Sequence, residues 1–188
     1  ESGEPFQVLY MVHQLYGDSS ILEFSAGGND QIFGGNSVII NDIYGDASDI
    51  FGGKGGNDQL TGGSNSGINN VWGDASYMVD ATDQYGQVRI SHGGNDVLIG
   101  GSGNQSNRLI GDAEFMVGGI GGNDLLIGGA FNAVSVMYGD ASAAMSGTAG
   151  GNDRLISGEC DDLMWGDFRY FETGDVVFGN DIFVFKSN

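Results

Sequence analysis

The residues best suited to chemistry in this chain are aspartates that recur in two short glycine-containing phrases. One phrase, "GGNDQIFGG" from Gly27, carries its Asp at the fourth position, and the other is an aromatic or aliphatic residue followed by "GD", as in "YGDAS" from Tyr44. The GGND aspartates are Asp30, Asp58, Asp96, Asp124, Asp153 and Asp181, and the GD aspartates are Asp18, Asp46, Asp74, Asp112, Asp140 and Asp167. Recurring carboxylates of this kind indicate cation coordination, and they do not form the single poised pair of an acid–base active site.

The two phrases keep a nearly constant spacing along the chain. From a GGND aspartate to the next GD aspartate the step is 16 residues four times and then 14. From a GD aspartate to the next GGND aspartate it is 12 to 14 residues, with one exception of 22 where the stretch "YMVDATDQYGQVRISH" intervenes. The chain is therefore a repeat of about 28 residues. The insertion, at about residues 76–92, predicts a loop that projects from one coil.

Apolar residues follow the same period and predict about three short strands per repeat. The three apolar columns read Ile32, Leu60, Leu98, Leu126, Ile156; then Leu15, Ile43, Val71, Leu109, Met137, Met164; then Leu22, Ile50, Met78, Met116, Ala144, Phe171. The strands are too short and too often followed by glycine for helices. Stacked ~4.8 Å apart, equivalent strands would pair and their apolar columns would form a continuous core. We expect an all-β fold, a right-handed parallel β-roll or β-solenoid of about six coils over residues 16–188, after an apolar N-terminal segment or cap over residues 1–15.

Stacking would place equivalent aspartates close together. Carboxylates roughly 5 Å apart repel by ~3 kcal/mol per pair at an effective dielectric of 20, against a total stability of ~5–15 kcal/mol for a whole domain. Either the carboxylates point into water, or cations lie between them. Glycine turns bring backbone carbonyls close to the carboxylates, and Ca²⁺ takes six to eight such oxygens in a flexible geometry. We therefore predict several Ca²⁺ ions bound by both columns, with an alternative for the GD aspartates: an Asp that caps its own turn.

These phrases resemble the calcium-binding nonapeptides of the RTX (repeats-in-toxin) family, G-G-x-G-x-D-x-U-x with U a large aliphatic residue. "GKGGNDQL" from Gly53 matches through Asp58 and Leu60, with Lys54 in place of the second glycine, and "GIGGNDLL" from Gly119 matches in the same way. The similarity extends over nearly the whole chain from about Tyr16. It implies a calcium-filled parallel β-roll, secretion through a type I system, and folding that waits for extracellular calcium.

The chain departs from the family pattern in two respects. Simple RTX arrays repeat every nine residues, whereas the period here is about 28. In addition, Asn41, Asn69, Asn107 and Ser135 stand where the family places a calcium Asp in the second half of the coil.

Composition restricts the partners. The formal net charge is −19, with only 6 Lys and Arg, so the surface repels nucleic-acid phosphates and anionic membranes. No apolar run approaches the ~20 residues of a membrane span, so we expect no membrane insertion. Cys160 is the only cysteine, which excludes an intrachain disulfide and favours a small buried thiol. His13 and His92 lie apart from any nucleophile in the sequence, and we expect no enzyme.

Two further features bear on function. The residues before the "GD" glycines, Tyr16, Tyr44, Trp72, Ile110, Tyr138 and Trp165, predict a packed aromatic ladder more than a glycan platform. Both ends are apolar, "FQVLYMV" (Phe6 to Val12) and "DIFVF" (Asp181 to Phe185), which fits either capping strands or head-to-tail stacking into a homo-oligomer. We expect an extracellular calcium-dependent structural protein that forms filaments or a surface layer. The alternative is a calcium-binding secretion or carbohydrate-binding module of a larger secreted enzyme.

Overall fold

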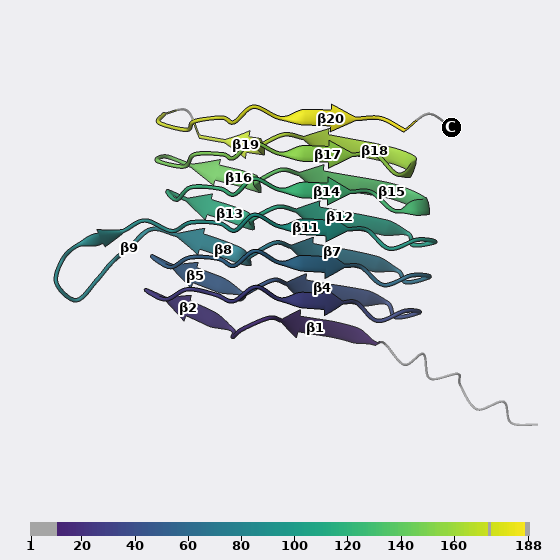
Figure 1. The fold of residues 1–188 in the computed structure, drawn as a ribbon, viewed down its shortest axis with the longest axis horizontal. Helices are drawn as coiled ribbons and strands as arrows, with labels where there is room; N and C mark the ends of the chain where they lie inside the picture. The colour runs from purple at the N-terminus through teal and green to yellow at the C-terminus, as the bar shows by residue number, and fades with distance from the viewer. Residues whose placement is uncertain (1–10, 173, 187–188) are drawn as a thin grey trace, which may run out of the picture.

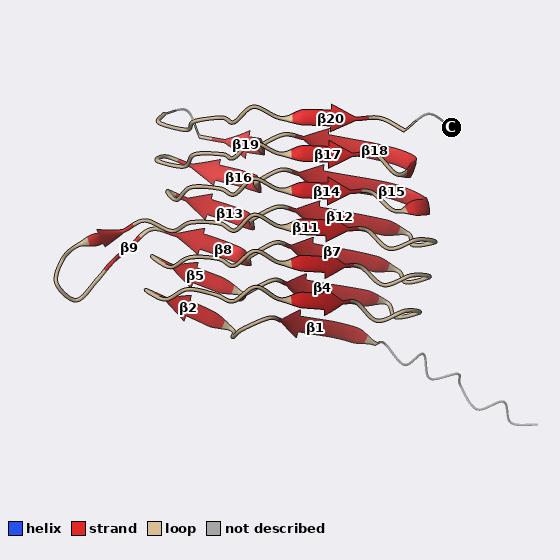
Figure 2. Cartoon of the chain, viewed as in Figure 1, coloured by secondary structure: helices blue, strands red, loops and turns tan. Residues whose placement is uncertain are grey.

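The computed structural model describes residues 11–172 and 174–186, and these form a parallel β-solenoid of about six coils (Figure 1). The described residues contain strands, turns and loops and no helix (Figure 2). Each coil passes in turn through three six-stranded sheets. The predicted fold class is confirmed.

The strands repeat in the same order in every coil. The first sheet holds β1 (Val12–Tyr16), β4 (Ile40–Tyr44), β7 (Ile68–Trp72), β12 (Ser106–Ile110), β15 (Ala130–Tyr138) and β18 (Glu159–Trp165). The second holds β2 (Ile21–Glu23), β5 (Asp49–Phe51), β8 (Ala75–Val79), β13 (Ala113–Val117), β16 (Ala141–Met145) and β19 (Phe168–Phe171). The third holds β3 (Gln31–Phe33), β6 (Gln59–Thr61), β11 (Val97–Ile99), β14 (Leu125–Ile127), β17 (Arg154–Ile156) and β20 (Ile182–Val184).

The strand register follows the sequence period. Ile43 pairs with Leu15 on one side and with Val71 on the other, each 28 residues away. Strands of the first two sheets point one way across the molecule in Figure 1, and strands of the third sheet point back. The third sheet therefore lies opposite the first, and each coil is flattened.

The predicted insertion is a hairpin that projects from the third coil. Strand β9 (Ala81–Thr82) pairs antiparallel with β10 (Val88–Arg89), and Figure 1 shows this hairpin reaching away from the stack. Val79 pairs with Val117 and His92 bridges to Ile120, so residues 80–91 stand where the next coil has only Gly118 and Gly119. We call residues 80–91 the arm.

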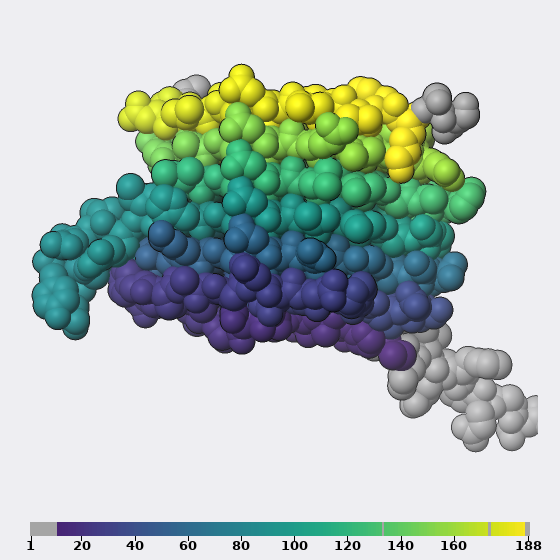
Figure 3. Space-filling model, in the orientation of Figure 1, coloured from purple at the N-terminus to yellow at the C-terminus, as the bar shows by residue number. Residues whose placement is uncertain are grey.

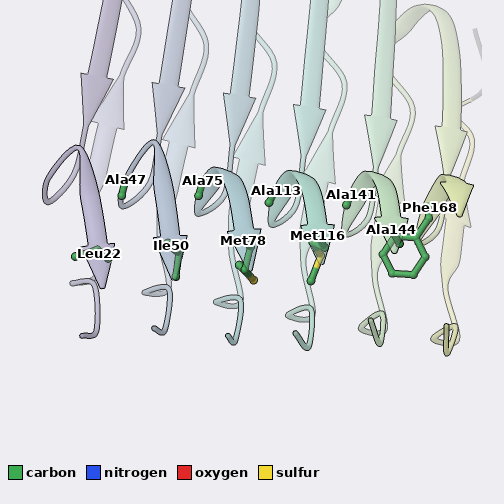
Figure 4. Packing of buried hydrophobic residues seen from close by; sticks show 10 residues of the cluster. All are labelled: Leu22, Ala47, Ile50, Ala75, Met78, Ala113, Met116, Ala141, Ala144 and Phe168. Carbon is green, nitrogen blue, oxygen red and sulfur yellow. The ribbon is translucent and has the colours of Figure 1, made fainter. Parts of the chain in front are cut away.

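Three buried apolar clusters run along the stack, and two of them contain the aliphatic columns. One lies between the first and third sheets and contains Ile43, Leu60, Val71, Leu98, Leu109, Leu126, Met137 and Leu155. The other lies beneath the second sheet and contains Leu22, Ala47, Ile50, Ala75, Met78, Ala113, Met116, Ala141, Ala144 and Phe168 (Figure 4). The apolar side chains thus stack in files, one residue above its copy in the next coil.

One predicted core position is wrong, and a second is in register but not buried. Leu155, not Ile156, pairs with Leu126 and is fully buried. In the last coil Phe171 pairs with Ala144, as the predicted column requires, but it is about half exposed and packs edge-on against Phe178, and it is Phe168, the partner of Ala141, that joins the buried cluster. Phe168 stands where earlier coils place alanine, and the larger ring fills the end of the core.

The N-terminal segment expected over residues 1–15 falls partly outside the described residues. Its last part belongs to β1, which pairs with β4 as the first strand of the first sheet. Met11 precedes this strand, and the rest of the apolar stretch, residues 6–10, lies outside the described residues.

Candidate metal centre

The aspartates of the two columns occupy facing turns of each flattened coil. Each GD aspartate follows a strand of the first sheet, and each GGND aspartate precedes a strand of the third sheet, as Asp46 and Asp58 do in the second coil. Along the chain, Asp46 comes between Ile43 of one apolar cluster and Ala47 of the other. The acidic side chains therefore lie between two apolar cores.

Most of these aspartates are buried. Asp46, Asp74, Asp112 and Asp140 have no exposed surface, and Asp58, Asp96, Asp124, Asp153 and Asp167 have almost none. Asp18 is exposed, and Asp30 and Asp181 are half-buried, because they belong to the first or the last coil. All twelve predicted residues thus form two files, and the files are enclosed except at their ends.

The GGND aspartates bind one another through their backbone. The amide of Asp58 donates to Oδ1 of Asp96 at 2.6 Å, and the amide of Asp96 donates to Oδ1 of Asp124 at 2.8 Å. The same bond joins each neighbouring pair from Asp30 to Asp181. In this way one carboxylate oxygen of a GGND aspartate gains a hydrogen-bond partner in each coil after the first.

The GD aspartates instead accept a bond from the opposite turn. The amide of Gly56 donates to Oδ2 of Asp46 at 2.9 Å, and the amide of Gly122 donates to Oδ1 of Asp112 at 2.8 Å. Each GD aspartate therefore binds the GGND turn across the coil interior, whereas a turn-capping Asp would bind its own turn. This bond brings the two columns together.

Glycine is required where each carboxylate meets the facing backbone. A Cβ atom on Gly45 would overlap Oδ2 of Asp58, and a Cβ atom on Gly55 would overlap Oδ1 of Asp74. The glycines of both phrases repeat this close approach in other coils. The two phrases are thus complementary, since each supplies the carboxylate that fills the space left by the glycine of the other.

One carboxylate oxygen of many aspartates has no hydrogen-bond partner among the described residues. These buried oxygens belong to Asp30, Asp46, Asp58, Asp96, Asp112, Asp124, Asp140 and Asp153. Buried polar atoms are nearly always paired, because an unpaired one loses its interaction with water without replacement. A row of such atoms therefore points to a missing positive partner.

Burial and mutual repulsion raise the pKa values of aspartates in both columns. Loss of water, together with the charges of neighbouring aspartates, raises the pKa of Asp46, Asp58 and Asp153 to about 7. Burial also raises the pKa of Asp74, Asp96, Asp112, Asp124 and Asp140 well above its usual range, again with neighbouring carboxylates adding to the effect. Without a cation, the interior favours protonated carboxyl groups.

Side chains alone do not form a metal cage here. Within residues 11–172 and 174–186, no three His, Cys, Asp or Glu side chains converge as they would around a metal ion. Carbonyl oxygens would have to complete the coordination. The carbonyl of Gly73 lies against Gly45 of the preceding coil, and that of Gly28 lies against Gly56 of the next. In the described chain no turn amide donates to either carbonyl. This all-oxygen set fits a hard cation such as Ca²⁺.

The asparagines that interrupt the RTX pattern form a second interior ladder. The side-chain amide of Asn41 donates to Oδ1 of Asn69 at 2.8 Å, and that of Asn69 donates to Oδ1 of Asn107 at 2.8 Å. The Asn69 amide also donates to the carbonyl of Gly63 at 2.8 Å. All three asparagines are fully buried. Their fixed place two residues before the buried aliphatic residue is the only sequence signal of this role.

The aromatic column forms a packed ladder, as predicted. Tyr44 stacks on Trp72 with ring centroids 4.5 Å apart, and Tyr138 stacks on Trp165 at 5.1 Å. Tyr44, Trp72 and Tyr138 are buried, and Ile110 packs with them in the coil that lacks a ring, so this part of the column is closed to a glycan. Cys160 is half-buried, its sulfur 3.3 Å from the Ser135 hydroxyl.

No protein-family model matches the chain, and comparison with curated proteins and with solved structures finds no similar protein. The RTX resemblance therefore remains a prediction based on the phrases themselves. The described residues include no helix of the length and apolar character needed to cross a membrane.

Proposed function

We propose that this chain is an extracellular calcium-binding structural protein, whose solenoid binds Ca²⁺ between the GD and GGND aspartates of neighbouring coils. The observation that carries the proposal is the row of buried carboxylate oxygens without partners, from Asp30 to Asp153. Burying charges without counter-charges costs several kcal/mol per ion. The glycine carbonyls beside the carboxylates supply the further neutral oxygens that Ca²⁺ requires.

Folding of the solenoid at neutral pH would then require calcium. The unfolded chain separates the two columns, so it offers no comparable site, and binding would stabilise only the solenoid. A chain with net charge −19 that loses these ions would retain the full repulsion of its acidic interior. This dependence suits a protein that meets high calcium only after leaving the cell.

Differential scanning calorimetry of the full chain tests the proposal. At neutral pH we expect a high melting temperature in millimolar calcium and loss of the cooperative transition after chelation with EDTA. Magnesium at the same concentration should restore less, because it demands a stricter octahedral geometry. An unchanged melting temperature after complete chelation would refute the calcium claim.

The two ends of the solenoid support head-to-tail stacking as the mode of assembly. The first coil exposes Ile21 and Phe33, which is 64% exposed, and the last exposes Ile182 and Phe183, which is 42% exposed. Phe33 and Phe183 both belong to the third sheet, at its opposite edges. A second copy in register would therefore extend each sheet and cover apolar side chains at both ends.

Sedimentation and electron microscopy at millimolar calcium test this assembly. Filaments that grow with protein concentration are expected, and Phe33→Asp with Phe183→Asp should suppress them without changing the melting temperature of the monomer by more than a few degrees. Monomers alone at high concentration of the wild type would exclude the filament.

A further inference from the structure

The arm and the first two coils enclose a groove that the calcium columns do not use. The groove has a volume of about 1000 Å³, within the range of small-ligand sites. Its walls come from the arm on one side and from Glu23–Ala26 and Gly52–Lys54 on the other. Figure 3 shows the arm set off from the body beside these coils.

The arm is held in place at its base and at its turn. The Ser91 amide donates to Oδ1 of Asp80 at 2.8 Å, and the Ser91 hydroxyl accepts from the Gly52 amide at 3.0 Å. Near the tip, Asp83 accepts from the Tyr85 amide at 2.9 Å and forms an ion pair with Arg89 at 2.9 Å. The bond between Gly52 and Ser91 joins the base of the arm to the solenoid, and the other contacts stabilise the arm itself.

At the floor of the groove the backbone of Gly52 lies very close to neighbouring side chains. Gly52 has φ +58, and a Cβ atom there would lie 2.8 Å from Cβ of Arg89 and 3.0 Å from the ring of Phe24. Phe24 itself has φ 51, a left-handed conformation that costs free energy for a bulky residue. The strained backbone presents the Phe24 ring, which is 42% exposed.

The chemistry of the groove differs from that of the rest of the molecule. It contains two of the six Lys and Arg residues and one of the two histidines, in a chain of net charge −19. Its formal charges balance, because Lys54 and Arg89 face Glu23 and Asp83. Two exposed aromatic rings complete it, Phe24 and Tyr85, the latter 79% exposed.

We propose that this groove binds a neutral pyranose oligosaccharide. Sugar hydroxyls both donate and accept hydrogen bonds, so they suit a lining that mixes Glu23, Lys54 and Gln84. The C–H faces of a pyranose ring suit the exposed faces of Phe24 and Tyr85, which offer large apolar area at low entropic cost. Balanced charge in the groove gives an anion no net attraction against the long-range repulsion of the acidic chain.

Binding is tested with the full chain in millimolar calcium and four probes, the tetrasaccharides of glucose, galactose, mannose and N-acetylglucosamine. Calorimetry should detect at least one, and its backbone amide shifts in NMR should concentrate in residues 23–26, 52–54 and 83–92. We expect Tyr85→Ala and Phe24→Ala to weaken binding about tenfold each. Tyr170→Ala, which removes a half-exposed ring at the far end of the solenoid, should leave it within about twofold.

A deletion separates this proposal from the calcium proposal. Replacing residues 80–91 with Gly-Gly copies the link of the next coil, Gly118–Gly119, and should abolish saccharide binding while leaving the calcium-dependent melting transition in place. Absence of binding by all four probes overturns the saccharide site, as does equal binding by the deletion variant. Tighter binding of an acidic or aromatic hexapeptide, in competition with the best sugar, would also overturn it in favour of a peptide partner.

Discussion

Two kinds of polar ladder run through the interior of this solenoid, one of asparagines and two of aspartates, and the two kinds differ in one chemical group. The Asn41–Asn69–Asn107 ladder presents an amide, which donates and accepts, so each residue satisfies the next. The aspartate columns present carboxylates, which only accept when charged, and they retain unpaired oxygens in a buried place. The same stacking geometry therefore satisfies the hydrogen bonds of the asparagines but leaves carboxylate oxygens of the aspartates without partners.

We expect the dependence of the fold on pH and on cations to lie in the aspartate columns. The asparagine ladder stabilises the turn between the third and first sheets through bonds such as those between Asn69 and Gly63. Because these groups are neutral, the bonds do not depend on pH or on cations. The acidic columns hold the facing turns only when a cation or protons balance their charge. Changes to charge should therefore act strongly on the aspartate columns and weakly on the asparagine ladder.

Of these changes, a change of pH should have the largest effect on stability, provided that the chain contains no metal. The folded pKa of Asp46, Asp58 and Asp153 is about 7, and the unfolded value is about 3.9. Between these values the folded chain binds more protons, so its stability is greatest below about pH 4 and is lost as the pH rises to about 7. Melting curves in EDTA across this range should show that fall, and calcium should restore stability at the upper end. Constant stability in EDTA would contradict the buried columns.

Asn69→Asp would convert one rung of the neutral ladder into an acidic one. The change removes donors to Gly63 and Asn107 and places a carboxylate against two acceptor oxygens, which we expect to cost about 3 kcal/mol at neutral pH. Denaturant unfolding in calcium measures the loss. Asn57→Asp, an exposed position, makes the same charge change and should cost far less.

Asp112→Asn makes the reverse exchange, and whether it stabilises or destabilises the fold should depend on calcium. In EDTA at neutral pH the amide replaces a buried carboxyl group that must either take up a proton on folding or stay charged near Asp74 and Asp140, and we expect stabilisation of about 1–2 kcal/mol. In saturating calcium the same variant should melt lower than the wild type, because a charged ligand is lost. Asp175→Asn, at an exposed site, controls for net charge. An identical shift with and without calcium would remove Asp112 from the metal site.

The smallest effect should come from the outer asparagines of the GGND phrase. Asn95 and Asn123 also pair through their side chains, at 2.9 Å, but they are exposed. Water can replace such a bond, so Asn95→Ala should change the free energy of unfolding by about 0.5 kcal/mol. A loss comparable with that of Asn69→Ala would show that burial is not what separates the ladders.

A local irregularity in the period and the end of the stack explain the differences from the predicted core. The step from Leu126 to Leu155 is 29 residues, and a column carried forward one residue too far selects Ile156, which lies on the opposite face of the strand. In the last coil Phe171 keeps the predicted register with Ala144, but it is half exposed because its strand is the last of the second sheet. The arm, by contrast, could be predicted from the spacing, because ten extra residues cannot fit between stacked coils and must project outward.

The sequence by itself determined the period, the parallel stacking of short strands and the two aspartate columns, since each follows from repetition and from residue type. The tertiary structure decided that the columns face each other across a flattened coil, between two apolar cores, with each carboxylate against the glycine of the other phrase. It also decided that Asn41, Asn69 and Asn107 form a ladder, and that the arm closes a groove over Gly52. These relations depend on how a coil folds back on itself, and a one-dimensional period carries no information about distances across the coil.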